Sequence, residues 1–296
     1  MRRSSNLAVR GFAFGALALL GLWSAPAKAY CLTTTCDTKA DICHDGETGC
    51  TPLFYASSCV SFAVDHRGSP KLNVSYDAMH QIATSAFAQW LSVDCGGGAT
   101  PGLHVQDQSP FSGMLPDAII SQQAANVITF QDNDWPYGDS NSMIALTTVF
   151  FDTRTGEIAG AVLDVNSFGF DLGLPGSGKM DLAGVVTHET GHFLGLAHSL
   201  DHTATMYANY NPELATLGTD DKRAICSALP PTRSTVTNDC TAKHGFYEES
   251  QAKAGCCSTA TGAGSTSNQS LALSALCLGL VTWRGRRRFK RSALRR

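Results

Sequence analysis

Residues 187–206 read THETGHFLGLAHSLDHTATM, with three histidines and a glutamate among the first twelve residues. His188 and His192 are four residues apart, so a helix would place both imidazoles on one face, close enough to bind one metal ion. Glu189 follows the first of these histidines and can direct its carboxylate at a water on that ion. The pair indicates a zinc site, although several unrelated classes of zinc enzyme share this spacing.

Gly195 and His198 decide between those classes. Gly195 can adopt the left-handed conformation that ends a helix, which lets the chain turn sharply. His198 would then return to the ion as a third nitrogen ligand. Three neutral imidazoles with one open position are typical of a catalytic zinc site, and HExxHxxGxxH is the signature of the metzincin class of zinc proteases. We therefore expect Zn²⁺ to be bound by His188, His192 and His198. A zinc-binding fold without activity is the alternative, against which the presence of Glu189 argues.

The run HETGHFLGLAHS resembles the zinc helix of the matrixins, the matrix-metalloproteinase-like metzincins. It has their glycine before the second histidine and their serine after the third. Met206 falls eight residues beyond His198 and precedes Tyr207. This order is similar to the matrixin Met-turn, whose methionine lies beneath the zinc. An astacin-like metzincin is a second alternative, but astacins place a tyrosine where this chain has Ala208.

The resemblance implies an α+β fold of the metzincin type. Such a fold has a twisted mixed five-stranded sheet with two long helices, of which one is the zinc-binding helix, followed by a Met-turn and a C-terminal helix. It would cover about residues 59–229 as the catalytic domain. Residue patterns predict helices around residues 79–90, from residue 182 and from residue 219, and strands at residues 59–65, 103–106, 126–131, 143–152 and 157–166.

The same resemblance implies a metalloendopeptidase that acts on protein or peptide substrates. Zinc would activate a water and polarise the scissile carbonyl, while Glu189 would accept the water's proton and pass it to the leaving amine. The substrate would lie extended along the edge strand Ala145–Phe151, and residues 207–217 would form the wall of the pocket past the cleaved bond. A surface binding or adhesion module that uses an inert zinc fold is the non-enzyme alternative.

The chain also departs from the matrixin pattern. Matrixins usually bind a second, structural zinc before the zinc helix, and Val162 stands where one of its histidines is expected, so we expect that site to be absent. Asp164 and Asn166 are candidate Ca²⁺ ligands, although an Asp/Asn pair at a hairpin end is more often a turn or cap. The latency motif PRCGxPD is missing, and Cys36 is the nearest candidate for its cysteine by position alone.

The first 29 residues have the three parts of an export signal peptide. Three arginines supply the positive region, residues 11–23 are apolar but too short to span a bilayer, and Ala27-Lys28-Ala29 is the small-x-small pattern that signal peptidase cuts. A buried N-terminal helix is the alternative. We expect cleavage before Tyr30 and export of the remaining chain.

The cysteine content of the chain favours a protein that works in an oxidising compartment, where disulfides form. Four of them lie in residues 30–58, a Cys-rich segment with few hydrophobic residues, which we expect disulfides to hold. A second zinc site in this segment is the alternative, but its C-x4-C and C-x6-C spacings differ from the short pairs of structural zinc. The predicted exported part contains an even number of cysteines, which favours disulfides of undetermined pairing: Cys31, Cys36, Cys43, Cys50, Cys59, Cys95, Cys226 and Cys240.

Charge is distributed unevenly along the chain. The formal net charge is −3, but twelve of the 22 Lys and Arg residues lie in the first 29 and the last 13 residues, which contain no acid. Residues 30–283 therefore carry about −15. An acidic body of this kind argues against a nucleic-acid partner.

Residues 230–270 form a Cys-containing linker, and residues 271–296 form a hydrophobic and basic tail. Its apolar part has thirteen residues, fewer than the roughly 20 that a stable membrane span needs. Cys256-Cys257, the polar linker, the apolar stretch and the arginine cluster together resemble the myxobacterial C-terminal sorting signal. This resemblance implies an exported protein that the tail anchors transiently in the membrane until sorting machinery processes it near the cysteines. A plain tail anchor, or a basic tail bound to anionic lipid, is the alternative.

Overall fold

The computed structural model describes residues 28–36, 43–112, 126–233 and 287–295. Most of the predicted signal peptide, the linker from residue 234 onward and the apolar part of the predicted tail lie outside these ranges. Within the described residues, no helix combines the length and the apolar character that crossing a membrane requires.

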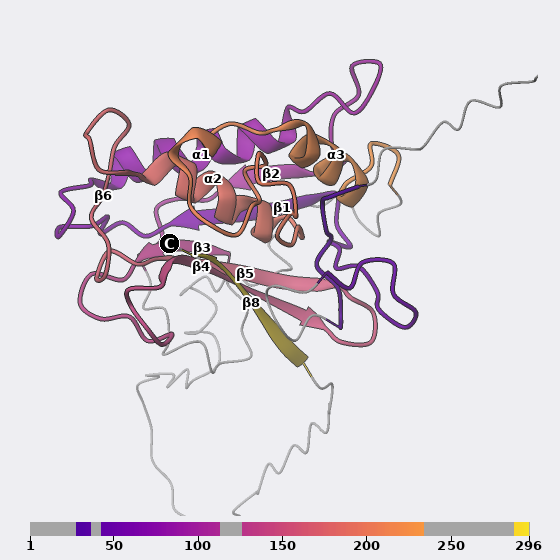
Figure 1. The fold of residues 1–296 in the computed structure, drawn as a ribbon, viewed down its shortest axis with the longest axis horizontal. Helices are drawn as coiled ribbons and strands as arrows, with labels where there is room; N and C mark the ends of the chain where they lie inside the picture. The colour runs from indigo at the N-terminus through magenta and orange to yellow at the C-terminus, as the bar shows by residue number, and fades with distance from the viewer. Residues whose placement is uncertain (1–27, 37–42, 113–125, 234–286, 296) are drawn as a thin grey trace, which may run out of the picture.

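A mixed sheet forms the framework of the molecule (Figure 1). In spatial order its strands are β2 (His104–Asp107), β1 (Cys59–Val64), β3 (Val127–Phe130), β5 (Ile158–Val165), β4 (Met143–Asp152) and β8 (Arg287–Arg295). The first four are parallel, whereas β4 is antiparallel to β5 and β8 is antiparallel to β4. Strands β1 to β5 confirm the predicted mixed five-stranded sheet, with ends within a few residues of those expected.

Two helices pack on one face of this sheet, α1 (Tyr76–Leu91) and α2 (Leu182–Phe193) (Figure 1). α1 begins after Ser75, whose hydroxyl accepts a hydrogen bond from the Ala78 N–H. The buried side chains of α1 recur at helical spacing and face the core: Met79, Ile82, Ala83, Ala86, Phe87 and Trp90. A third helix, α3 (Thr219–Ala228), follows a short 3₁₀ turn, η1 (Pro212–Leu214).

α2 carries HExxH and is buried along most of its length, because it packs against both α1 and the sheet. The helix begins at residue 182 as predicted, and Asp181 caps its start by accepting hydrogen bonds from the Ala183 and Gly184 N–H groups. Asp181 also ends β7 (Met180–Asp181), which pairs with β6 (Leu172–Gly173). The Trp90 indole donates a hydrogen bond of 2.8 Å to the Thr187 carbonyl, which fixes α1 against α2 one residue before the first histidine.

Disulfides hold the segment that precedes β1, as the sequence predicts. Cys31 pairs with Cys43 and Cys36 with Cys50, so these four sulfurs are not available as zinc ligands. In particular, Cys36 does not supply the free thiol that a latency cysteine would need. A third disulfide joins Cys95, after α1, to Cys226 in α3, and Cys59 is also disulfide-bonded.

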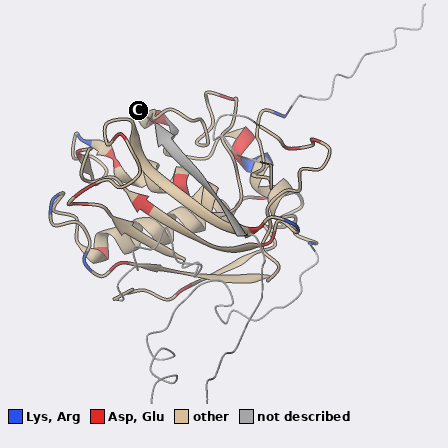
Figure 2. Ribbon diagram, turned by 90° about the horizontal axis from the view of Figure 1, so that it is seen from below, with Lys and Arg blue, Asp and Glu red and all other residues tan. Residues whose placement is uncertain are grey.

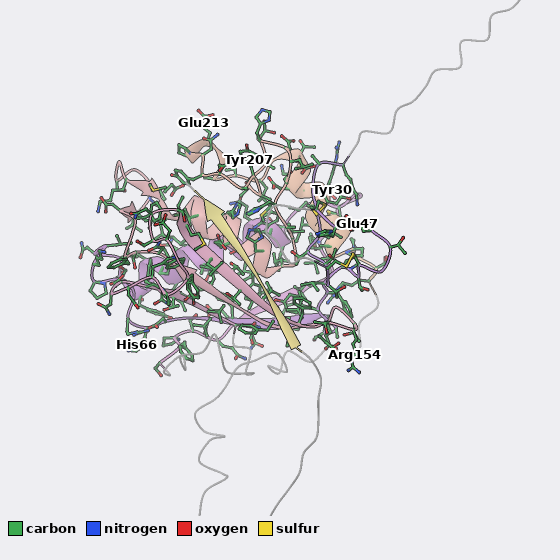
Figure 3. All side chains as sticks on the ribbon, turned by 60° about the horizontal axis from the view of Figure 1, so that its bottom comes forward. Tyr30, Glu47, His66, Arg154, Tyr207 and Glu213 are labelled. Carbon is green, nitrogen blue, oxygen red and sulfur yellow. A yellow bond between two sulfur atoms is a disulfide. The ribbon has the colours of Figure 1, made fainter. Side chains whose placement is uncertain are left out.

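A sixth strand, β8, was not predicted. It pairs with β4 over nearly its whole length, from Asp152 opposite Arg287 to Met143 opposite Arg295. The sequence pattern indicated only a basic tail, because main-chain pairing at a sheet edge requires no particular alternation of side chains. In Figure 3, β8 extends from the side of the molecule that carries Arg154 toward the side that carries Tyr207 and Glu213.

Basic residues are few on the rest of the described chain. In Figure 2 the Lys and Arg positions outside β8 are scattered around the rim of the molecule and form no band across the face shown. The described body therefore presents no basic stripe of the kind that tracks a phosphate backbone in that view.

We expect loss of the Cys95–Cys226 disulfide to destabilise the fold more than loss of the Cys31–Cys43 disulfide. The two bridges span 131 and 12 residues of sequence, and the entropy that a bridge removes from the unfolded chain rises with the logarithm of that span. Chain entropy alone predicts a difference of about 2 kcal/mol. Urea unfolding of Cys95→Ala/Cys226→Ala and of the matched Cys31→Ala/Cys43→Ala pair measures it, and equal destabilisation would contradict the expectation.

Candidate metal centre

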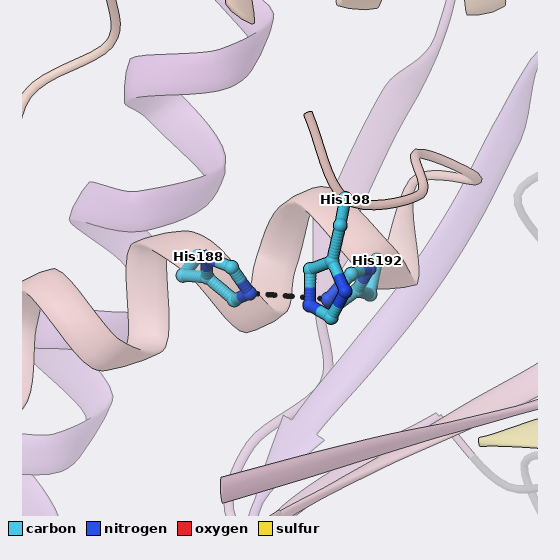
Figure 4. A group of neighbouring side chains, drawn as sticks. All are labelled: His188, His192 and His198. Atoms are coloured by element: carbon cyan, nitrogen blue, oxygen red, sulfur yellow. Dashed lines mark hydrogen bonds between the residues drawn. The ribbon is translucent and has the colours of Figure 1, made fainter. Parts of the chain in front are cut away.

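His188 and His192 lie on one face of α2, as their spacing predicts, and both are buried. Their Nε2 atoms are 3.1 Å apart. His198 approaches from the segment after the helix, with ring centroids 5.4 Å from His188 and 4.8 Å from His192. The three rings converge on one point (Figure 4), and their candidate ligand atoms lie within 4.8 Å of one another. The predicted cluster of three histidines is therefore present.

Gly195 makes the turn that brings His198 back. Its φ is +96°, a conformation that side-chain-bearing residues rarely adopt. The Gly195 and Leu196 N–H groups donate to the carbonyls of His192 and Gly191, which closes the last turn of α2. The chain then reverses direction within three residues of Gly195.

The N-terminal segment holds the returning chain in place. The Thr33 N–H donates to the Gly195 carbonyl and the Ala197 N–H donates to the Cys31 carbonyl, both at 2.9 Å. Two residues past His198, the Leu200 N–H donates to the Ala29 carbonyl at 3.0 Å. Cys31 and Thr33 of the disulfide-linked segment thus hold the chain just before the third histidine, a role that the cysteine spacing alone did not indicate.

Backbone carbonyls determine the tautomers of the two helical histidines. His188 Nδ1 lies 2.6 Å from the Thr205 carbonyl, and His192 Nδ1 lies 2.8 Å from the Leu196 carbonyl. A carbonyl oxygen only accepts, so each Nδ1 carries the proton and each Nε2 presents a lone pair. Two such lone pairs 3.1 Å apart repel one another, whereas a cation between the rings would attract both. The donor set therefore fits a zinc ion.

The electrostatic environment keeps His188 in the form that binds metals. Burial, and secondarily the nearby His198, lower the pKa of His188 to about 3. The ring is therefore neutral at physiological pH, as a metal ligand must be.

Met206 lies against α2 beside the histidines. It is buried, and a Cβ added to Gly191 would come within 2.3 Å of its sulfur, so only glycine allows this approach. The chain segments that carry His198 and Met206 run side by side, because the Ser199 N–H donates to the Met206 carbonyl at 2.9 Å. The structure thus places the predicted methionine next to the turn of α2 that separates His188 from His192.

The carboxylate of Asp221, in the first turn of α3, holds the Met206 loop. It accepts hydrogen bonds from the N–H groups of Thr205, Met206 and Gly218 at 2.7, 3.0 and 2.8 Å. Burial raises the pKa of this carboxyl, although the three N–H groups oppose that shift. Its neighbour Asp220 accepts a hydrogen bond of 2.6 Å from the Ser199 hydroxyl. The sequence pattern placed both acids near the end of the domain but did not predict these contacts.

Glu189 is fully buried, and the Thr147 hydroxyl lies 2.6 Å from its Oε2. Thr147 belongs to β4, so this contact connects the sheet to the carboxylate between the first two histidines. Sequence analysis missed Thr147, because nothing in the strand pattern distinguishes it from Thr148.

Asp164 and Asn166, the candidate Ca²⁺ ligands, bind protein groups in the structure. The Asp164 carboxylate accepts hydrogen bonds from Gln131 Nε2 and from the Tyr137 hydroxyl, both at 2.7 Å. Asn166 donates through its amide to two loop carbonyls, and its Oδ1 accepts from the Gly169 N–H. The two side chains fasten the loops around the end of β5, and neither belongs to a metal-binding cluster among the described residues. The structure therefore does not support the candidate Ca²⁺ assignment.

A small pocket opens beside His188. Its lining comes from the start of α2 and from the segment after Met206: Asp181, Gly184, His188, Thr205, Asn209, Tyr210, Asn211 and Pro212. The Tyr210 hydroxyl accepts a hydrogen bond of 2.8 Å from the Asp181 N–H, which ties this segment to the N-terminus of α2. Residues 209–212, part of the segment after Met206, therefore lie beside the first histidine.

Residues 104–228 match the family model of the matrixins. The match runs from the first residue of β2 to the last residue of α3, and it contains the histidine cluster, Glu189 and Met206. It supports a zinc metalloprotease of the metzincin type, in agreement with the resemblance of the zinc helix. The predicted domain begins earlier, at Cys59, so β1 and α1 lie outside the matched residues.

We expect Asp221→Asn to loosen the metal centre. In either orientation, the asparagine amide would point its N–H₂ group at a backbone N–H that now donates to the carboxylate, which leaves buried donors unsatisfied at a cost of about 1–3 kcal/mol each. Thermal unfolding should show a lower Tm, and titration with a zinc chelator should show weaker retention of the ion. Asp201→Asn, at a partly exposed turn, is the matched control, and an Asp221→Asn variant as stable as that control would contradict the assignment.

Proposed function

We propose that the protein is a zinc-dependent endopeptidase of the matrixin type. The observation that carries this proposal is the convergence of three buried imidazoles, two with Nε2 lone pairs turned toward the same point, in a motif whose Glu189 is itself buried. The matrixin match over residues 104–228 supports the same assignment. An inert zinc fold that serves binding or adhesion is the alternative, but it gives no reason for a buried carboxylate beside the metal ligands.

In this proposal each residue of the motif has one task. His188, His192 and His198 hold the zinc, which when bound would supply Lewis-acid activation of water and of the scissile carbonyl. Glu189 accepts a proton from the attacking water and returns it to the leaving amine, first as general base and then as general acid. Met206 fills the space against Gly191 and gives the site an apolar floor.

The substrate would be an extended segment of a protein or peptide. It would pair through its main chain with Ala145–Phe151 of β4, the strand whose Thr147 contacts Glu189. In the described chain β8 pairs with this edge, and Ser292 is the register partner of Thr147. A substrate that uses the same main-chain groups must displace β8, so β8 would act as a competitor for the site.

We further propose that the protein works outside the cytoplasm. The disulfides support an oxidising compartment, and residues 1–29 have the organisation of an export signal. The tail that follows residue 270 would anchor the chain transiently in the membrane until sorting machinery processes it, which leaves the acidic domain at the cell surface or released. Processing before β8 would also remove the competitor for the substrate edge.

Removal of the proton acceptor should abolish proteolysis without removing the metal. We expect Glu189→Ala and Glu189→Gln to lower kcat/KM for casein cleavage by about 10²-fold or more, because general-base catalysis contributes at least that much. Zinc content, measured by atomic emission, should remain one ion per chain.

The wild-type activity should disappear with a zinc chelator and return with added zinc. Exposed Glu47, in the segment before β1, provides the control variant Glu47→Gln, which should cleave casein like the wild type. Normal cleavage by Glu189→Ala would rule out the mechanism. A zinc-loaded wild-type chain without β8 that cleaves no peptide would favour the inert binding module.

Release of β8 should raise activity. We expect a chain that ends at residue 286, and a full chain with Arg291→Pro/Ser292→Pro, to show severalfold higher kcat/KM than the full wild-type chain. Adjacent residues of a strand direct their N–H groups to opposite sides, so the double proline removes at least one hydrogen bond to β4. Arg291→Ala/Ser292→Ala is the matched control. Equal activity of the proline and alanine chains would show that β8 does not compete with substrate.

A further inference from the structure

The hydroxyl of Thr147 makes a close contact with the carboxylate to which the proposed function assigns proton transfer. Its Oγ1 lies 2.6 Å from Glu189 Oε2 and 3.1 Å from the Glu189 carbonyl oxygen. Both residues are fully buried, so water does not compete freely for this contact. We propose that Thr147 is a positioning residue that holds the Glu189 carboxylate in the orientation needed for proton transfer. This inference rests on the proposed function.

The chemistry of the two groups determines the direction of the hydrogen bond. An ionised carboxylate only accepts, and a threonine hydroxyl has one proton to donate. The carboxylate is both the nearer acceptor and the charged one, and hydrogen bonds to a charged acceptor are about twice as strong as neutral ones. Thr147 therefore donates to Oε2, which assigns the proton-accepting role to the other oxygen, Oε1.

The donor is held more rigidly than the carboxylate that it contacts. Thr147 lies in the middle of β4, opposite Leu163 of β5, and its β-branched side chain has restricted rotation. Glu189 has three side-chain torsions, of which the last is soft. A fixed donor on a stiff side chain therefore selects one orientation from those that the glutamate would otherwise sample.

Thr148 is a matched comparison within the same strand. Successive side chains of a strand point to opposite faces, so Thr148 is directed away from α2. It is as buried as Thr147, and its hydroxyl has no hydrogen-bond partner among the described residues. Replacement of threonine by valine removes a hydroxyl group at both positions. Only at Thr147 does it also remove a contact with Glu189.

The test compares Thr147→Val, Thr147→Ser and Thr148→Val in the chain that ends at residue 286 and in the full chain. Thr147→Val should lower kcat for peptide cleavage about tenfold or more, with little change in KM, zinc content or Tm. Thr147→Ser retains the hydroxyl and should stay within about threefold of the wild type. Thr148→Val leaves both the main chain of β4 and the contact with Glu189 in place, so it should lower kcat less than Thr147→Val does. These magnitudes lie below the 10²–10⁴-fold contribution of the base itself, because the carboxylate remains present.

A structural readout accompanies the kinetics. A crystal structure of Thr147→Val should show the Glu189 carboxylate in a new orientation or in more than one, with the three histidines unmoved. If Thr147→Val does not fold, Thr147→Ala also removes the hydroxyl and replaces it in the comparison.

Several results would overturn the inference. Unchanged kcat in Thr147→Val would do so, as would equal losses in the valine and serine variants or a loss that follows Tm or zinc content. If the wild-type chain cleaves no peptide either, the proposed function fails and this inference fails with it. An active wild type with an equally active Thr147→Val variant refutes only the role of Thr147.

Discussion

The carbonyl oxygens of Thr205 and Leu196 determine the chemistry of the metal centre, because each accepts the Nδ1 proton of one helical histidine. Rotation of either carbonyl would let the ring change tautomer and turn a proton, rather than a lone pair, toward the centre. Both carbonyls belong to loops, which lack the regular backbone hydrogen bonds that would fix them in a helix or a sheet. The residues that surround the site hold these two loops in place. Asp221 fixes the loop of Thr205 through three N–H groups.

The loop that contains Leu196 is held by the disulfide-linked segment before β1. Leu32, Leu53 and Tyr55 of this segment pack into the core, and the disulfides Cys31–Cys43 and Cys36–Cys50 cross-link the stretch between Cys31 and Cys50. Thr33 and Cys31 of this segment hydrogen-bond to Gly195 and Ala197, just before His198. The geometry of the third histidine is therefore coupled to the oxidation state of cysteines that do not touch it. A reducing compartment would weaken the site without altering any ligand.

Local sequence patterns predicted the helices, the strands of the five-stranded sheet and the cluster of three histidines. They did not predict contacts between residues that are distant in sequence. His188 and His192 follow from the period of a helix, and Gly195 follows from the conformation that glycine alone adopts readily. The partners of Asp164, Gln131 after β3 and Tyr137 in the following loop, are not brought to it by sequence spacing, so the pattern gave no sign of its hydrogen bonds. β8 was missed for a related reason, since main-chain pairing at an edge leaves little trace in side-chain order. Thr147 carries no local signal either, because its importance depends on where α2 crosses β4.

β4 performs two tasks because the groups that perform them point in different directions. Its main-chain N–H and C=O groups lie in the plane of the sheet and pair with β5 on one side and with an added strand on the other. The side chain of Thr147 stands perpendicular to that plane, toward α2 and Glu189. An added strand therefore leaves the hydroxyl free of competition while it restricts the motion of the backbone that carries it. An extended peptide bound at the edge of β4 would consequently stabilise the contact between Thr147 and the Glu189 carboxylate while that carboxylate accepts the proton. The same argument applies to β8, which would keep the site ordered even while it excludes substrate.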